Sequence, residues 1–361
     1  MSRPLLIIAC YAANYGGNFI RSVSALAGAY DGDVTFLLPE AARDKKWLDE
    51  LSDYVIEFAS FTNKGLHDAC AALGRKCGRD VIVHVHFLTG LSLRTITAEF
   101  PNVLCHWHMA VDPPVGLKNK MVAVAKRAAF STFYPRARFI AVSEPVAASL
   151  REEYPMVRVE CVPNAIDFSR YVGRKADAHN RPNRPIRALI FGSHFERKAI
   201  DVAMAACDRL AQRGNDVVLT VATHSPCECR EKVAAIRGDV PSWMHIIPVM
   251  EDVASLYESA DLFLSPSRSE AFGYAVVEGA YMGCGVVASD VPGQNTLKCI
   301  QGIQWVHPED PDGLADAMLA SVGMLTSRTQ VVLDALRSDL ECQYGIDRWV
   351  EQILNIYSSI G

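Results

Sequence analysis

Two glutamates with seven residues between them, Glu270 and Glu278, are the side chains whose type and spacing could do chemistry. A carboxylate accepts several hydrogen bonds, so two of them spaced along an elongated ligand suit the paired hydroxyl groups of a nucleotide-sugar. Two solvated glutamates on a protein surface would show the same spacing, because glutamate is mostly an exposed residue. The sequence on either side of the pair is therefore needed to distinguish these interpretations.

Those segments predict a strand, a loop and a helix. Residues 261–264 are a short apolar run typical of a buried strand, and a polar loop follows over residues 267–273. Residues 274–282 are apolar and rich in small side chains, which predicts a helix, and residues 285–290 predict the next strand. Ligands of open α/β sheets bind beyond the carboxyl ends of the strands, where a helix N-terminus offers N–H groups to a diphosphate. Glu270 would lie at the mouth of that crevice.

This stretch resembles the signature of a large family of retaining glycosyltransferases, family 4 of the group 1 type. The resemblance is carried by Glu270-Ala-Phe-Gly273, by Glu278-Gly-Ala-Tyr-Met-Gly-Cys-Gly285 and by the strand that ends at Asp290. It implies an α/β protein of the GT-B fold, with two Rossmann-like domains facing across a cleft. It also implies transfer of a hexosyl group from a UDP- or GDP-sugar to an acceptor hydroxyl in glycoconjugate or cell-surface polysaccharide synthesis.

The resemblance assigns a role to each residue of the motif. Glu270 would hold sugar hydroxyls near the reaction centre, and Glu278 would hold the ribose. The backbone amides of Phe272 and Gly273 would hold the sugar or a phosphate. We expect no metal and no other cofactor, so side-chain cations and amide dipoles would have to stabilise the departing diphosphate.

Two cations stand at the start of a second predicted helix. Strand 187–191 and a short loop lead to a helix predicted over residues 198–213, which places Arg197 and Lys198 at its N-terminus. The helix dipole disfavours cations at this position unless a bound anion offsets their charge, so the pair could indicate an anion site. The alternative interpretation is that the first turn is frayed and the two cations are solvated. In the family a lysine here and an upstream arginine clamp the donor diphosphate. Lys198 matches, but Ser193 follows the strand where the arginine would be, so we assign the missing charge to Arg197.

The first apolar run of the chain leads into a glycine pair. Residues 5–11 predict a buried strand, Gly16 and Gly17 follow, and residues 19–28 predict a helix. Glycine lets a backbone come close to a ligand, although most such pairs are only turns. The family carries a Gly-Gly loop here that faces donor sugar and acceptor, and we transfer that role to Gly16 and Gly17.

Four histidines lie in two pairs near predicted strand ends: His84 and His86, then His106 and His108. Residues at i and i+2 of a strand point to one face, so four such imidazoles could hold zinc. Packed or hydrogen-bonded histidines are the alternative, which the lack of cysteine or acidic partners at ligand spacing favours. In the family a histidine after such a strand contacts the donor sugar. We assign His108 to it, with His106 as the alternative.

A second group of potential metal ligands has a local explanation. His224, Cys227 and Cys229 lie close in sequence, but Ser225 and Glu228 predict the capping box of a helix. Two cysteines that are two residues apart on a helix point in different directions. We therefore expect no metal at this group.

The 361 residues suffice for two domains, and half of them are hydrophobic. Alternating strands and helices predict parallel sheets. We expect an acceptor-side Rossmann-like domain over 1–172, a polar hinge over 173–186 and a nucleotide-sugar-binding domain over 187–343. A helix over 344–361 would follow, which in the family crosses back to the first domain.

Charge and composition limit the partners. The net charge of −5 argues against a nucleic-acid binder, and eleven scattered cysteines indicate a reduced, cytosolic setting. No apolar run approaches the ~18 residues of a membrane span. Residues 103–139 carry six Lys or Arg against one acid. The basic stretch 118–138 could dock on an anionic membrane surface or a phosphate-bearing acceptor, or be a solvated amphipathic helix. The expected partners are the donor and a glycan or glycolipid acceptor.

Two other classes of function share these features. A sugar-nucleotide epimerase or a phosphorylase of the same fold would use a similar crevice. A non-catalytic sugar-nucleotide-binding protein is the other class, and the departure at Ser193 supports it.

Overall fold

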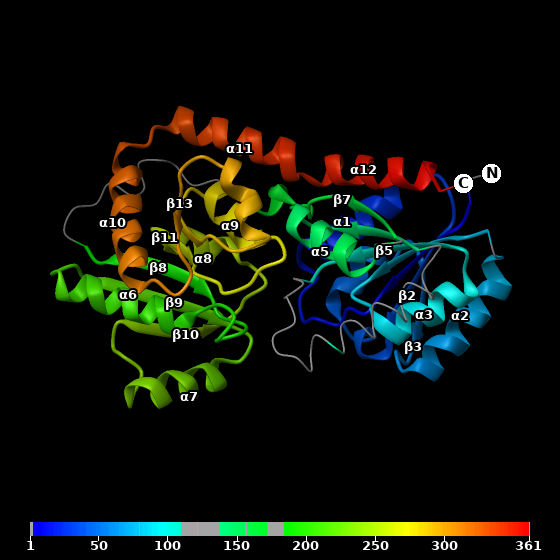
Figure 1. The fold of residues 1–361 in the computed structure, drawn as a ribbon, viewed down its shortest axis with the longest axis horizontal. Coiled ribbons are helices and arrows are strands. Elements are labelled where there is room, and N and C mark those ends of the chain that lie inside the picture. Colours follow the sequence, from blue (N-terminus) through cyan, green and yellow to red (C-terminus); the bar gives the residue numbers. More distant parts are fainter. Residues whose placement is uncertain are drawn as a thin grey trace. The chain divides into compact units, whose positions relative to one another are not determined.

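A computed structural model describes residues 3–78, 80–109, 121, 137–155, 157–171 and 184–360. The chain forms two compact units (Figure 1). Unit 1 comprises Met1–Ala165 and Ile346–Gly361, and unit 2 comprises Ile166–Gly345. Most of the predicted hinge and of the basic stretch 118–138 lies outside the described residues.

Unit 1 is built on a seven-stranded sheet of order β3-β2-β1-β4-β5-β6-β7, in which all paired neighbours are parallel. Strand β1 is apolar and buried along its whole length, as expected of a parallel strand that is covered on both faces. The strands are β1 (Leu5–Ala9), β2 (Val34–Pro39), β3 (Val55–Ala59), β4 (Ile82–His86), β5 (Asn102–Trp107), β6 (Arg138–Ala141) and β7 (Arg158–Cys161). The helices are α1 (Gly17–Ala29), α2 (Asn63–Cys77), α3 (Gly90–Glu99), α5 (Glu144–Glu153) and α12 (Ile346–Ser358), with the 3-10 turns η1 (Glu40–Ala42) and η2 (Lys46–Leu51).

Unit 2 is built on a six-stranded parallel sheet of order β10-β9-β8-β11-β12-β13. The strands are β8 (Ile186–Phe191), β9 (Val217–Thr223), β10 (Met244–Pro248), β11 (Leu262–Ser265), β12 (Gly285–Ser289) and β13 (Ile303–Val306). The helices are α6 (Ile200–Gln212), α7 (Pro226–Arg237), α8 (Ala254–Ser259), α9 (Tyr274–Tyr281), α10 (Pro311–Ser327) and α11 (Gln330–Tyr344), with the 3-10 turns η3 (Phe168–Arg170) and η5 (Gln294–Cys299). The predicted α/β class and parallel sheets are confirmed.

The strand order of each sheet reverses at one point. In unit 2 the chain adds β9 and β10 on one side of β8, then returns to place β11, β12 and β13 on the other. In unit 1 the same reversal falls between β1 and β4. Ligands of such sheets bind beyond the carboxyl ends of the strands at these switch points. We therefore expect each unit to bind its ligand at the loops beside its switch point. These are the loops after β8 and β11 in unit 2 and the loops after β1 and β4 in unit 1.

The last helix, α12, is part of unit 1, and it is the red helix of Figure 1. It packs against α1, and its apolar face enters the core that β1 and β2 build. Arg3 donates a hydrogen bond of 2.6 Å to the carbonyl of Ile360, and Arg138 donates one of 2.8 Å to the carbonyl of Ser359. The amphipathic helix predicted at the end of the chain is present, and it begins after Gly345.

One predicted helix start is wrong, and a second is at the predicted residue but lacks its predicted cap. Helix α6 begins at Ile200 rather than at Lys198, because the buried Ala199 adopts a left-handed conformation with φ 53°. At α7 the side chain of Ser225 makes no capping hydrogen bond, since its ψ of 71° departs from the extended geometry of a capping box. Glu228 forms an ion pair of 2.9 Å with Lys232 instead.

All eleven cysteines are free. Among the described residues, no helix combines the length and the apolar character that crossing a membrane requires.

Candidate active site

The switch point of unit 2 brings the two predicted cations and the first predicted carboxylate together. Strands β8 and β11 are paired, with Leu262 opposite Ala188, so the loops that follow them are neighbours. The loop after β8 carries Arg197 and Lys198, and the loop after β11 carries Glu270. Residues 72 positions apart in sequence thus meet at one edge of the sheet.

Glu270 is the centre of this cluster. Its Oε1 pairs with the ammonium of Lys198 and accepts a hydrogen bond of 3.0 Å from Ser267, and its Oε2 lies 3.1 Å from Nη1 of Arg197. Only 10% of the Glu270 side chain is exposed, against 18% for Lys198 and 40% for Arg197. A buried, satisfied carboxylate is not a solvated surface glutamate, so that interpretation of the motif is wrong.

The cluster is electrostatically positive. Burial raises the pKa of the Glu270 carboxyl, but Lys198 first and Arg197 second outweigh it, so the pKa stays below its ordinary value. Glu270 is therefore ionised at neutral pH. Two cations share this one carboxylate, which leaves one positive charge in excess for an anionic ligand.

Backbone contacts fix the two loops against each other. The N–H of Arg268 donates a hydrogen bond of 2.8 Å to the carbonyl of Arg197, and Arg197 donates one of 3.2 Å to the carbonyl of Ser269. The guanidinium of Arg268 binds Asp201 of α6 at 2.7 and 3.0 Å and also pairs with Glu309. The cations and the carboxylate are thus held in place by hydrogen bonds outside the cluster itself.

Gly293, which the sequence did not single out, supports the loop of Glu270 from the next strand. It follows β12 with a φ of +83°, and a Cβ added there would lie 2.2 Å from the carbonyl oxygen of Glu270. Only glycine allows this approach. Its neighbour Gln294 is fully buried and donates a hydrogen bond of 3.1 Å to the carbonyl of Ser265.

The variant Gly293→Ala tests this support. We expect a loss of about 1–3 kcal/mol in the free energy of unfolding and a larger relative loss of activity, because the loop of Glu270 must move. Gly302→Ala is a matched control, since Gly302 also has a positive φ of +82° but the nearest atom to its added Cβ is 4.0 Å away. Chemical denaturation and turnover assays give both quantities. Equal behaviour of the two variants would contradict the role of Gly293.

The helix that follows the loop starts next to the cluster. Gly273 has a left-handed φ of 104°, which turns the chain into α9 at Tyr274, and Phe272 is buried. No side chain caps the N-terminus of α9, and its first turn contains no acidic residue. Its backbone amides and dipole can thus add to the positive field at Glu270.

Glu278 lies inside α9 and is 8% exposed. Its Oε2 accepts a hydrogen bond of 2.7 Å from the hydroxyl of Tyr257, which is fully buried in α8. Burial, and next the charge of Glu278, raise the pKa of Tyr257 well above its ordinary value, so this hydroxyl stays a neutral donor. Tyr257 therefore orients Glu278, and sequence reasoning missed it because the two residues lie on different helices.

The variant Tyr257→Phe removes this hydrogen bond, together with a longer one of 3.3 Å to the carbonyl of Ala275, and keeps the buried ring. If Glu278 binds the ribose of the donor, we expect the donor KM to rise about tenfold with kcat little changed. A hydrogen bond to a charged group contributes about 1.5–3 kcal/mol, and other partners of Glu278 would offset part of that loss. Tyr281→Phe is the control, because Tyr281 donates a similar bond of 2.6 Å to Glu341. Initial-rate kinetics over a donor series measure the effect. A fall in kcat with KM unchanged would contradict a binding role.

The remaining predicted site residues lie in unit 1. Gly16 precedes α1, and Gly17 opens it with a φ of +58°. Phe19, two residues further, contacts the ring of His108 with the centroids 5.9 Å apart. The structure thus places the glycine turn and His108 in one region of unit 1.

His106 and His108 differ in their environments. His106 is buried, with its ring stacked on Trp349 at 6.0 Å. His108 is half-buried, its Nε2 lies 3.0 Å from Nδ1 of His86, and burial lowers its pKa to about 3 against an opposing hydrogen bond to Asn164. Of the two, His108 is the one that a ligand could reach.

Cys227 of the second histidine and cysteine group is exposed while Cys229 is buried, so those two thiols do not share one environment.

The fold is that of GT-B glycosyltransferases. The crystal structure of Anabaena HepE in complex with UDP-glucose is similar over 99% of this chain and 100% of that one, with a TM-score of 0.75 at 16% identity. Residues 185–323, which lie in unit 2, match the family described as Glycosyl transferases group 1. The resemblance inferred from the Glu-x7-Glu motif is confirmed.

Curated relatives match part of the chain. A phosphatidyl-myo-inositol mannosyltransferase of Mycolicibacterium smegmatis is 30% identical over 165 residues, which is 44% of this chain and 41% of the relative. The amylovoran biosynthesis glycosyltransferase AmsK of Erwinia amylovora is 24% identical over 205 residues, 53% of this chain and 50% of the relative. The chain thus spans about two fifths to one half of these relatives.

Proposed function

We propose that this protein is a retaining glycosyltransferase that moves a hexosyl group from a UDP- or GDP-sugar to an acceptor hydroxyl. The observation that carries the proposal is the ionised Glu270 held between Lys198 and Arg197 at the switch point of unit 2. The names of the matched relatives support synthesis of a glycoconjugate or a cell-surface polysaccharide.

The charge of the leaving group is the main physical problem of this reaction. Lys198 and Arg197 lie where a diphosphate would bind, with the N-terminus of α9 beside them. Cations and fixed dipoles of this kind stabilise developing negative charge without reorganising during the reaction. In this scheme the departing diphosphate needs no divalent ion.

The other residues position the two substrates. Glu270 holds hydroxyls of the donor sugar, Glu278 holds the ribose, and the amides of Phe272 and Gly273 hold the sugar or a phosphate. Gly16, Gly17 and His108 contribute from unit 1. We propose that the acceptor hydroxyl attacks from the face of the leaving group, with the phosphate as the base that takes its proton.

The acceptor and the setting are part of the proposal, and chemistry and the names of the relatives support them. We propose a glycan or glycolipid acceptor at the cytosolic face of a membrane; the name of the phosphatidyl-myo-inositol mannosyltransferase supports a lipid acceptor. The basic stretch 118–138 would contact anionic lipid there. The free state of all eleven cysteines agrees with a reducing compartment.

The test is a transfer assay with a panel of UDP- and GDP-hexoses and simple acceptors, such as inositol derivatives and short glycans. We expect release of the nucleoside diphosphate to depend on the acceptor, and a product whose anomeric configuration is that of the donor by NMR. A product with an altered sugar and no transfer would identify an epimerase instead. Donor binding without nucleotide release for any acceptor would identify a non-catalytic binding protein.

A further inference from the structure

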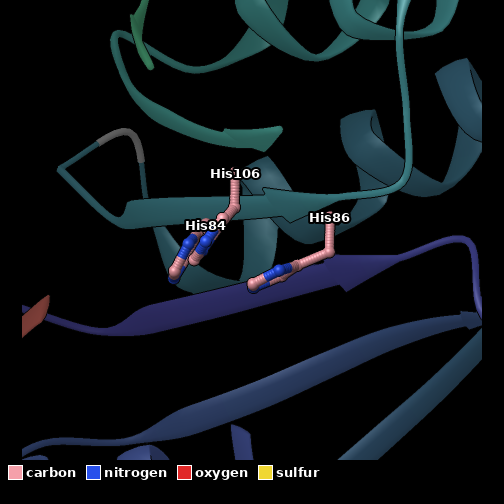
Figure 2. A group of neighbouring side chains, drawn as sticks. All are labelled: His84, His86 and His106. Atoms are coloured by element: carbon pink, nitrogen blue, oxygen red, sulfur yellow. The ribbon is translucent and has the colours of Figure 1, made fainter. Parts of the chain in front are cut away.

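Three histidines outside the proposed donor site gather on one face of the sheet of unit 1. His84 and His86 are at i and i+2 of β4, so their side chains share a face, and His106 of β5 is the register partner of His86. Figure 2 shows that the three side chains extend from the two neighbouring strands into the same space. Each is at most 1% exposed, and their ligand nitrogens all lie within 4.8 Å of one another.

The hydrogen bonds of these rings leave nitrogens free on the inner side. Nδ1 of His84 lies 2.7 Å from the hydroxyl of Tyr357, and Nδ1 of His86 lies 3.0 Å from Nε2 of His108. Nε2 of His84, Nε2 of His86 and both ring nitrogens of His106 are buried without a hydrogen-bond partner. A buried polar atom without a partner costs about 1–3 kcal/mol, so four in one cluster require an explanation.

We propose that His84, His86 and His106 bind a divalent transition-metal ion of the zinc type. Imidazole is a preferred ligand of such ions, and a ligating histidine ordinarily donates its other ring N–H to a neighbouring acceptor. His84 and His86 already have a partner at Nδ1, which leaves Nε2 of each for the metal. A tetrahedral ion with bonds of about 2.0–2.1 Å separates its ligand atoms by roughly 3.4 Å. On binding, the ligand atoms would close to this distance from the observed spacing of up to 4.8 Å.

The neutral state of the rings agrees with the proposal. Burial is the largest cause that lowers the pKa of all three histidines, and the neighbouring rings lower it further, so each offers a lone pair at neutral pH. The alternative is a group of packed, neutral histidines without an ion, as the sequence led us to expect. The two alternatives make opposite predictions for metal binding.

The proposed metal site would stabilise the fold of unit 1 and would take no part in sugar transfer. It joins β4 to β5, and through His86 it fixes the ring of His108. Because the three rings are buried, the ion would enter while the protein folds or opens locally, and its binding would stabilise the folded state.

The experiment uses the full chain, stripped with a chelator and then titrated with ZnCl₂ and, separately, CoCl₂. We expect one tightly bound ion per chain by elemental analysis, a rise in melting temperature, and a visible Co²⁺ spectrum typical of tetrahedral nitrogen ligands. His106→Asn should lose this ion. Tyr357→Phe keeps the buried ring but removes the partner of His84, and should weaken Zn²⁺ binding about 10- to 100-fold.

His224→Ala is the matched control, because His224 is exposed beside Cys227 and lies outside the cluster. It should bind the ion as the unchanged chain does. Substoichiometric metal in the unchanged chain would overturn the proposal, as would equal binding by the unchanged chain and Tyr357→Phe. These two arms decide the question even if His106→Asn fails to fold.

Discussion

Replacing Glu270 by glutamine will lower kcat/KM for the donor by about 10²- to 10³-fold. Removal of one preorganised group that stabilises a transition state typically has an effect of this size. Glutamine keeps the size of the side chain but removes the negative charge and one acceptor oxygen. Lys198 and Arg197 then lose the carboxylate that orients them, and the sugar hydroxyls lose an acceptor. Steady-state rates of nucleotide release measure the change.

The control for this variant is Glu228→Gln. Glu228 also pairs with a lysine of unit 2, but on the exposed face of α7, where such a pair contributes at most ~1 kcal/mol. It should retain full activity. Thermal melts must show that Glu270→Gln is folded. A folded Glu270→Gln variant with unchanged activity would remove Glu270 from the site.

Replacing Lys198 by methionine will lower kcat about 10³-fold, because the departing diphosphate loses the least exposed of its two neighbouring cations. Methionine keeps the apolar stem of the side chain, so the packing around it changes little. Glu270 keeps Arg197 at 3.1 Å and Ser267 at 3.0 Å, and so is not left without partners. Single-turnover kinetics separate the chemical step from donor binding.

Lys232→Met is the matched control, because Lys232 pairs with Glu196 and Glu228 at 2.9 Å on the surface of the same unit. It should behave as the unchanged protein. Lys198→Arg should restore part of the rate, since the charge is kept but its geometry changes. If Lys198→Met changed only KM, the lysine would bind the ground state alone and the proposed stabilisation of the leaving group would be wrong.

The sequence predicted the features that depend on local pattern. The apolar runs at residues 5–11, 187–191 and 261–264 became central strands, because a parallel strand that is covered on both faces needs continuous apolar residues. The position of Glu270 followed from the same pattern, since a loop after a central strand lies at the carboxyl edge of the sheet.

The features that sequence reasoning missed depend on partners far along the chain. The start of α6 moved because Ala199 is held in a buried left-handed turn, which no local preference predicts. Gly293 and Tyr257 support the two glutamates from other elements, through contacts that only the fold creates. The four ring nitrogens without partners likewise come together only because β4 and β5 are neighbours in the sheet.

In the proposed function, side-chain cations of unit 2 bind a nucleoside diphosphate without help from a divalent ion. Isothermal titration of the full chain with UDP, GDP and the corresponding monophosphates, in the presence of EDTA, tests it most directly. We predict that one diphosphate binds at least about tenfold more tightly than its monophosphate, a difference of about 1.4 kcal/mol from the second phosphate. Binding only after addition of Mg²⁺, or equal affinity for mono- and diphosphate, would contradict the account.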